Sequence, residues 1–202
     1  MNIRDHIESG ILELYVLGQT TPDETILIQK LAASDESIRN EILEIELSLE
    51  KYAQAHAVEP DAIIKPFLLA MLDYMDRMQN GEKASTPPLL HAGSNINDYL
   101  EWLNRADMVI ADDFNDVYAK IINYTPEIVT AIVWIKEMAP QEVHEDQFER
   151  FLIIEGTCDI VIDDEVHQLV PGDFLTIPLH KAHHVKVTST IPCKAILQRV
   201  AA

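Results

Sequence analysis

From about Val117 onward the chain alternates apolar and polar residues with a period of two, the pattern of β-strands with one buried face. Turn residues such as Asp163-Asp164 and Pro171-Gly172 separate most of the apolar runs. Eight short strands in about 85 residues predict a closed or nearly closed antiparallel β-barrel or jelly roll. The expected strands are 117–124, 128–137, 148–155, 158–162, 166–169, 174–177, 184–187 and 194–200.

Two segments of this half carry the polar residues of a candidate site. The first is Glu142-Val-His-Glu-Asp-Gln-Phe-Glu-Arg-Phe-Leu-Ile-Ile-Glu-Gly156, and the second is Gly172-Asp-Phe-Leu-Thr-Ile-Pro-Leu-His-Lys-Ala-His183. Together they resemble the paired motifs of the cupin superfamily, RmlC-like antiparallel β-barrels that often hold a metal. The resemblance implies a fold and a pocket but no particular reaction, since one fold serves enzymes, sensors and binders.

The resemblance also implies a set of metal ligands. The first cupin motif usually has two histidines one residue apart, a glutamate four or five residues later, and then a glycine. Counting back from Gly156 places Glu149 at the glutamate position, His144 at the second histidine position and Glu142 at the first. The second motif adds a histidine, and His183 takes that position. The implied ligands are Glu142, His144, Glu149 and His183.

This chain departs from the family pattern at Glu142, which stands where a histidine is usual, and at His180, which replaces a frequent glycine. A different register pairs His144 with Asp146, and His180 is a candidate to support the ligands. Imidazole and carboxylate ligands suit a divalent transition metal such as zinc, manganese, iron or nickel, and the sequence does not choose among them. The alternative is a barrel whose polar pocket is vacant or holds an organic ligand.

The chain has two cysteines, Cys158 and Cys193, and both lie in expected strands. Widely spaced cysteines of this kind are typical of buried thiols in a reducing compartment. A redox switch is the alternative, because strands of a barrel can bring distant cysteines together.

Residues 1–80 are expected to form a helical domain. An apolar pattern from Ile7 ends at Gly18, and Thr21-Pro-Asp-Glu24 has the form of a capping box at the start of the next helix. A longer helix should begin at Ser34 or Asp35. A fourth should open at Pro60, with an apolar side wide enough for the centre of a bundle or for an exposed face. We expect a linker over 81–95, and a barrel domain over 96–202 with a short leading helix.

The run from Leu14 to Glu24, with the segment Leu31-Ala-Ala-Ser-Asp35, is similar to the N-terminal domain of bacterial anti-sigma factors. With a cupin barrel after it, the arrangement resembles the ChrR-type anti-sigma factors. This implies that the helices bind an extracytoplasmic-function sigma factor and that the barrel takes part in sensing. The zinc ligands of that family are absent, since residues 1–80 lack cysteine and His6 alone cannot make a structural site. A generic helical bundle is the alternative.

The formal net charge of −19, from 34 acidic and 15 basic residues, argues against binding to nucleic acid or to anionic membranes. It suits a basic protein partner. The sequence contains neither a run of about 18 apolar residues nor the apolar core of a signal peptide, so a cytoplasmic location is expected.

These observations favour a transcriptional regulator, an anti-sigma factor whose barrel senses a metal, redox state or small molecule. The first alternative is a metal-dependent cupin enzyme, a dioxygenase or isomerase that uses the four implied ligands. The second is a non-catalytic barrel that binds a small ligand. A homodimer is expected in each case, because Ile38 to Tyr52 form a long apolar stripe and barrel edges commonly pair.

Overall fold

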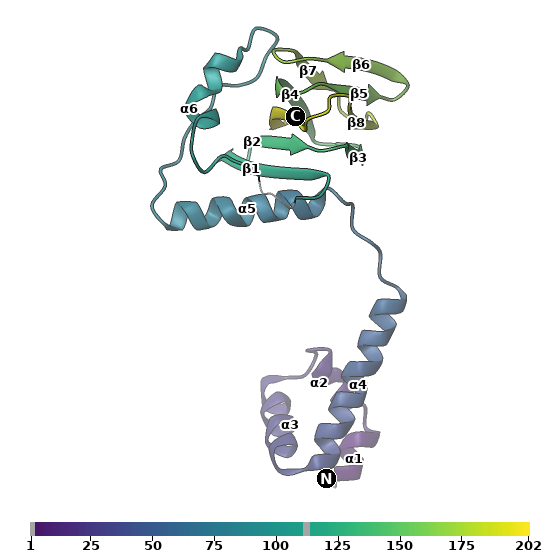
Figure 1. The fold of residues 1–202 in the computed structure, drawn as a ribbon. Coiled ribbons are helices and arrows are strands. Elements are labelled where there is room, and N and C mark those ends of the chain that lie inside the picture. The colour runs from purple at the N-terminus through teal and green to yellow at the C-terminus, as the bar shows by residue number, and fades with distance from the viewer. Residues whose placement is uncertain (1–2, 111–113) are drawn as a thin grey trace. The chain divides into compact units, whose positions relative to one another are not determined.

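The computed structural model describes residues 3–110 and 114–202. Helices occupy the N-terminal part and antiparallel β-sheets the C-terminal part, which confirms the predicted α+β class (Figure 1). The chain divides into two compact units, the helical unit (residues 1–59) and the barrel unit (residues 60–202). The boundary lies about twenty residues before the expected end of the helical domain, because the helix after residue 60 packs on the barrel.

The described residues of the helical unit form four helices, and local signals define their ends. They are α1 (Ile3–Glu8), α2 (Ile11–Val16), α3 (Pro22–Ser34) and α4 (Glu36–Ala55). The predicted capping box is present, since the Thr21 hydroxyl accepts a hydrogen bond from the Glu24 amide at 3.3 Å and the Glu24 carboxylate accepts one from the Thr21 amide at 2.8 Å. At the start of α4, the Asp35 carboxylate accepts hydrogen bonds from the amides of Ser37 and Ile38.

The core of the helical unit is small. Leu12, Ile28 and Ile38 are fully buried, with partly buried residues such as Ile42 around them. Large apolar side chains lie exposed on α2, at the residue after it, and on α3 and α4: Leu14, Leu17, Ile26, Leu27, Leu43, Leu47, Leu49 and Tyr52. Much of the apolar surface of this unit therefore faces away from its core.

The barrel unit is a jelly roll of two antiparallel sheets. The five-stranded sheet has the order β1-β2-β9-β4-β7 and the four-stranded sheet the order β3-β8-β5-β6. The strands are β1 (Val117–Tyr124), β2 (Ile128–Ile135), β3 (Met138–Glu142), β4 (Gln147–Glu155), β5 (Cys158–Ile162), β6 (Glu165–Leu169), β7 (Phe174–Ile177), β8 (His183–Val187) and β9 (Cys193–Ala201). Eight correspond to predicted strands. The sequence pattern missed β3, in which Pro140, Gln141 and Glu142 break the alternation.

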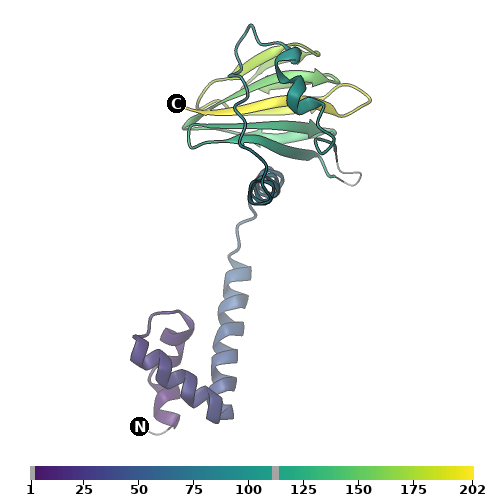
Figure 2. The same ribbon diagram turned by 90° about the vertical axis from the view of Figure 1, so that its left-hand side faces the viewer.

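Apolar residues cover both faces of the five-stranded sheet. On β4, Phe151 and Ile153 point into the core between the sheets, whereas Leu152 points to the outer face. The outer face is covered by residues 81–110 (Figure 2), which include η1 (Ile96–Tyr99) and α6 (Leu100–Leu103). This double coverage explains why β2 and β9 are apolar over most of their length.

Helix α5 (Ile64–Gln79) belongs to the barrel unit and lies along β1 (Figure 1). We expected it to close a helical domain ending at residue 80. Instead Ala70 and Tyr74 are buried against the barrel core, while Leu68 and Leu72 on its other side are exposed. Its wide apolar surface is therefore divided between the sheet and an exposed face.

The segment that we expected to be a linker, residues 81–95, is packed on the barrel, and we call it the strap. Within the strap, the side chain of Leu90 is fully buried against the five-stranded sheet. Gln198 of β9 accepts a hydrogen bond from the Leu90 amide at 2.7 Å and donates one to the Pro88 carbonyl at 2.7 Å. Tyr99 donates to the same carbonyl at 2.8 Å. Buried hydrogen bonds thus fix a segment whose composition alone resembles a flexible loop.

Side chains from α5 and the strap also contact the outer edge of β1. Arg77 donates to the Ile121 carbonyl, and the Ser85 hydroxyl donates to the Ile122 carbonyl at 2.8 Å. The pairing of β1 with β2 shifts by one residue between Ile121 and Asn123. In the described residues, no helix is long and apolar enough to cross a membrane.

Candidate metal centre

Strand pairing gathers the implied ligands at one end of the barrel. Glu142, at the end of β3, lies opposite His183 at the start of β8. Glu149 of β4 belongs to the other sheet and lies opposite Arg199 of β9. His144 is in the turn between β3 and β4. Because both sheets turn these residues inward, their side chains meet between the sheets.

Three of the side chains form a group that could hold a metal ion. One donor atom from each of His144, Glu149 and His183 lies within 4.8 Å of the other two. The Nε2 atoms of His183 and His144 lie 3.0 and 3.6 Å from Oε2 of Glu149. Two imidazoles and one carboxylate are donors that suit several divalent transition metals.

The burial of these donors also fits a metal. Glu149 and His183 are 1% and 3% exposed. The Nε2 atom of His144 is buried without a hydrogen-bond partner among the described residues. A buried ring nitrogen without a partner carries an energetic cost, which coordination to a metal would remove.

Glu142 is near this group but is held differently. Its Oε2 atom accepts a hydrogen bond from Nη2 of Arg199 at 2.8 Å and lies 3.8 Å from Nε2 of His144. The residue that replaces the usual first histidine is therefore paired with an arginine. The structure places it next to the group of three donors, not within that group.

Arg199 is the residue of this site that we did not predict. Its Nε donates to Oε1 of Glu149 at 2.9 Å, and its guanidinium lies 4.4 Å from the centre of the Phe67 ring of α5. The alternation of β9 contained the signal, because Arg199 follows Ala195 and Leu197 on the face that points into the core. A charged residue in that position needs a buried partner.

The surroundings keep Glu149 ionised. Burial alone would raise the pKa of its carboxyl group, but the nearby His144 ring, the hydrogen bond with His183 and the charge of Arg199 hold that pKa well below its ordinary value. Burial alone would likewise lower the pKa of His183, but the hydrogen bond to Glu149, the charge of that carboxylate and the contact with the Lys181 carbonyl together raise it. Burial and the charge of Glu149 raise the pKa of Glu142.

Two other candidates lie outside the group of donors. Asp146 is exposed and lies outside the group of donors. The structure thus does not support the alternative register, which pairs His144 with Asp146. The side chain of His180 is also exposed, but its backbone amide donates to the His144 carbonyl at 2.8 Å and so holds the turn that carries this candidate ligand. His180 has a φ of 59°, a conformation that glycine adopts readily, and this explains why the cupin motif frequently has a glycine at this position.

Cys158 of β5 and Cys193 of β9 are free thiols buried in the core between the sheets. The hydrogen bond to Cys193, together with burial, raises the pKa of the Cys158 thiol. The same hydrogen bond lowers the pKa of the Cys193 thiol. The burial of both thiols limits their access to reagents. The structure thus agrees with buried thiols, and a redox role stays a prediction.

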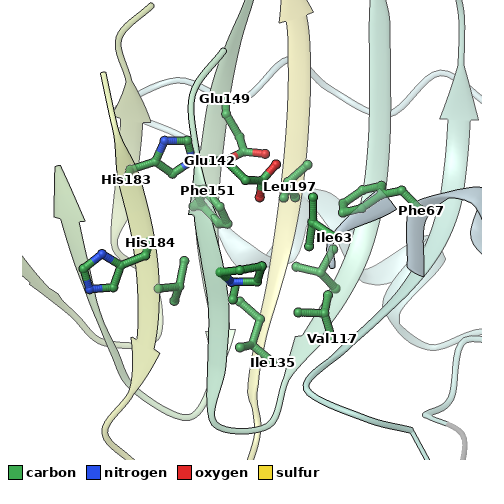
Figure 3. Close-up of a pocket in the computed structure, with 14 residues that line it drawn as sticks. Ile63, Phe67, Val117, Ile135, Glu142, Glu149, Phe151, His183, His184 and Leu197 are labelled. Carbon is green, nitrogen blue, oxygen red and sulfur yellow. Dashed lines mark hydrogen bonds and ion pairs between the residues drawn. The ribbon is translucent and has the colours of Figure 1, made fainter. Parts of the chain in front are cut away.

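The space beside the donors is small and mostly apolar. About 20 Å³ is left at its centre, and Glu142, Glu149 and His183 line it together with Ile63 and Phe67 (Figure 3). Figure 3 also shows His184, the residue after His183, pointing away from Glu149, as expected from strand alternation.

Comparisons with known proteins agree with this architecture. Residues 130–198 match the family model of the cupin domain. A cupin superfamily protein from Desulfitobacterium hafniense is 22% identical, with 46% of this chain and 84% of that chain covered and a TM-score of 0.41. An RmlC-like cupin from Shewanella frigidimarina is 15% identical, with 48% and 88% covered and a TM-score of 0.42.

The cupin domain of Schizosaccharomyces pombe Cnp3 is 8% identical to this chain, with 46% of this chain and 69% of that chain covered and a TM-score of 0.43. The comparison with curated proteins finds no match. The C-terminal half of the chain therefore contains a cupin domain, and its two histidines and glutamate are a possible metal site of unassigned metal.

Proposed function

We propose that this protein is a transcriptional regulator, an anti-sigma factor whose helical unit sequesters an extracytoplasmic-function sigma factor and whose barrel responds to a bound metal. The observation that carries the proposal is the apolar surface of the helical unit. Among the residues described from position 3 onward, Leu12, Ile28 and Ile38 are fully buried there. Leu14, Leu17, Leu43 and Tyr52 are each about half exposed or more. Such a surface is typical of a protein-binding module.

Charge favours a basic partner for this surface. Residues 1–59 contain 12 acidic and 4 basic side chains, which gives a formal charge of 4 − 12 = −8. Acidic residues such as Glu44 and Glu46 lie on α4, the helix that carries exposed Leu43 and Leu47. A complementary partner would combine apolar and basic residues and associate rapidly through electrostatic attraction.

The barrel is better suited to sensing than to turnover. Its donors fit a metal ion, but the space beside them is far smaller than the roughly 300–1,000 Å³ of ordinary ligand pockets. A sensor needs only that metal binding favour one of two states with different affinity for the sigma factor. The first helix of the barrel unit, α5, borders the metal centre and directly follows the helical unit in the chain.

A metal-dependent enzyme is a second candidate, because three protein donors leave coordination positions open for a substrate. A metal bound there would supply Lewis acidity. His144, Glu149 and His183 would hold it, and Arg199 would keep Glu149 oriented. Substrate entry would require that Ile63 and Phe67 move. Turnover by the metal-loaded protein would support this candidate over the regulator.

The test is capture of partners by the tagged full-length protein in its native host, followed by mass spectrometry. We expect a sigma factor at near-stoichiometric amount. The variant Leu43→Asp/Leu47→Asp, which changes two exposed residues of α4, should lose most of it. The control Val166→Asp changes an exposed apolar residue of β6 and should retain it. Recovery of no sigma factor, or equal recovery with the α4 variant, contradicts the proposal.

The predicted homodimer is part of the same proposal, and light scattering of the purified protein measures it directly. If the protein is a monomer at micromolar concentration, the homodimer prediction is wrong, and the sigma-factor prediction is unaffected.

A further inference from the structure

Helix α5 closes the metal centre from one side. Ile63, the residue before the helix, is buried, and Phe67 lies one turn further along the chain. Both line the same small space as Glu149 and His183, and Figure 3 shows the Phe67 ring pointing towards that space. A ligand that entered from this side would meet these two side chains first.

Arg199 connects Phe67 to both glutamates. Its guanidinium donates to Glu142 and Glu149 at 2.8 and 2.9 Å, and the Phe67 ring lies 4.4 Å from it. An arginine held by two carboxylates has a fixed position, and an aromatic ring beside it gains a favourable cation–π interaction. The position of Phe67 is therefore determined by the same network that orients Glu149.

The two oxygens of Glu149 have separate roles. Oε1 accepts the hydrogen bond from Arg199, whereas Oε2 lies towards His144 and His183. A metal ion at Oε2 would leave the hydrogen bond at Oε1 intact. Metal binding thus does not require Arg199 or Phe67 to move.

An organic ligand is a different case. The space of about 20 Å³ corresponds to one water molecule, since a single water needs about 10–15 Å³ by the same measure. A chelating ligand of five heavy atoms would have to displace Phe67, Ile63 or both. The space beside Glu149 and His183 thus holds about one water molecule and is too small for such a ligand.

We infer that Phe67 and Ile63 are the residues that restrict this metal centre to an ion and water, by excluding any organic ligand from the open coordination positions of the metal. The inference rests on the metal site of the proposed function. It assigns the selectivity to the first turn of α5 and the residue before it, which cover the barrel at this end. Removal of the Phe67 ring should open space on the order of 100 Å³ beside the metal.

The test uses the full-length protein loaded with Co²⁺, whose visible spectrum reports its coordination, and acetohydroxamate as a bidentate probe. The wild-type protein should bind Co²⁺ and show no spectral change at millimolar acetohydroxamate. Phe67→Ala should show a saturable change, with a dissociation constant at least about ten-fold lower than that of the wild type. Phe67→Val, which keeps part of the apolar contact, should show a spectral change in the same direction. It replaces Phe67→Ala in the test if that variant does not fold.

Leu68→Ala is the matched control, because Leu68 is the next residue of α5 and is 55% exposed. It should behave like the wild type. Equal responses of the wild-type and Phe67 proteins overturn the inference, and so does a Co²⁺-loaded Phe67 variant that does not respond. In both cases the metal site itself stands. Failure of the wild-type protein to bind Co²⁺ overturns both the inference and the metal-dependent part of the proposed function.

Discussion

The helical unit and the barrel unit differ in how the sequence specifies them. In the helical unit, helix ends are fixed by neighbouring residues such as Thr21 and Glu24, and three side chains are fully buried. In the barrel unit, strands distant in sequence pair with one another, and apolar clusters cover both faces of the five-stranded sheet. Local signals thus form the helices, whereas long-range burial supplies the stability of the barrel.

The largest expected effect comes from removing one fully buried isoleucine in each unit. Ile38→Ala and Ile196→Ala should each cost about 2–4 kcal/mol. In the helical unit this loss should unfold α2 to α4, because a unit of 59 residues with a small core has little stability to spare. The barrel should stay folded. Hydrogen exchange measured by mass spectrometry reports the unfolding of each unit separately. If the amides of α4 stay protected in Ile38→Ala, the predicted difference in stability between the units is wrong.

Metal should stabilise only the barrel. A divalent metal at one hundred times its dissociation constant should add about 2.7 kcal/mol to the unfolding free energy of the barrel unit and nothing to the helical unit. His144→Ala/His183→Ala should abolish metal uptake and this stabilisation while the barrel remains folded. His184→Ala, on the opposite side of β8, is the control that should retain both. Stoichiometric metal in the double variant would refute the assignment of these ligands.

Alanine substitution of one glycine with positive φ in each unit tests how closely the surrounding atoms pack on the backbone there. Gly18 has a φ of 69° and open space around an added Cβ, so Gly18→Ala should cost about 1–2 kcal/mol. At Gly156, with a φ of 72°, an added Cβ would lie 2.8 Å from the Pro192 carbonyl oxygen. Gly156→Ala should therefore cost about 1–3 kcal/mol more. Thermal unfolding measures the difference, and equal costs would show that the loop after β8 yields easily.

The smallest expected effect is on the stability of the barrel unit at acidic pH. The hydrogen bond from Arg105, with that from Arg77, outweighs burial and lowers the pKa of Glu82. A lowered pKa stabilises the fold above the ordinary carboxyl value of 4.5, and the stabilisation is lost as the pH falls through the folded-state pKa. Glu82→Gln should remove this part of the pH dependence, on the order of 1 kcal/mol, from the barrel unit. Unfolding of wild type and variant at pH 6 and pH 3.5 tests it, with Glu24→Gln in the helical unit as the comparison.

The sequence predicted features that depend on neighbouring residues. The capping box at Thr21, the α+β class and eight of the nine strands follow from spacing and alternation. The proximity of Glu142, His144, Glu149 and His183 follows from the resemblance to cupin motifs. Each of these has a signal within a few residues of the feature itself.

What the sequence did not predict depends on distant partners. The apolar face of α5 is compatible with a bundle or with a sheet, and only the presence of β1 decides between them. The strap has the composition of a linker, yet Gln198 of β9, more than one hundred residues away, fixes it. Arg199 belongs to the site because it lies opposite Glu149 in the strand pairing.

The contacts on the outer edge of β1 have a consequence for self-association. The free edge of a sheet is a template on which a second copy can add a strand, and many proteins aggregate in this way. Here the carbonyls of Ile121 and Ile122 already accept hydrogen bonds from Arg77 and Ser85. An incoming strand would have to displace two side chains anchored in α5 and the strap. The residues that attach these segments to the barrel thus also hinder edge-to-edge association of two copies through β1.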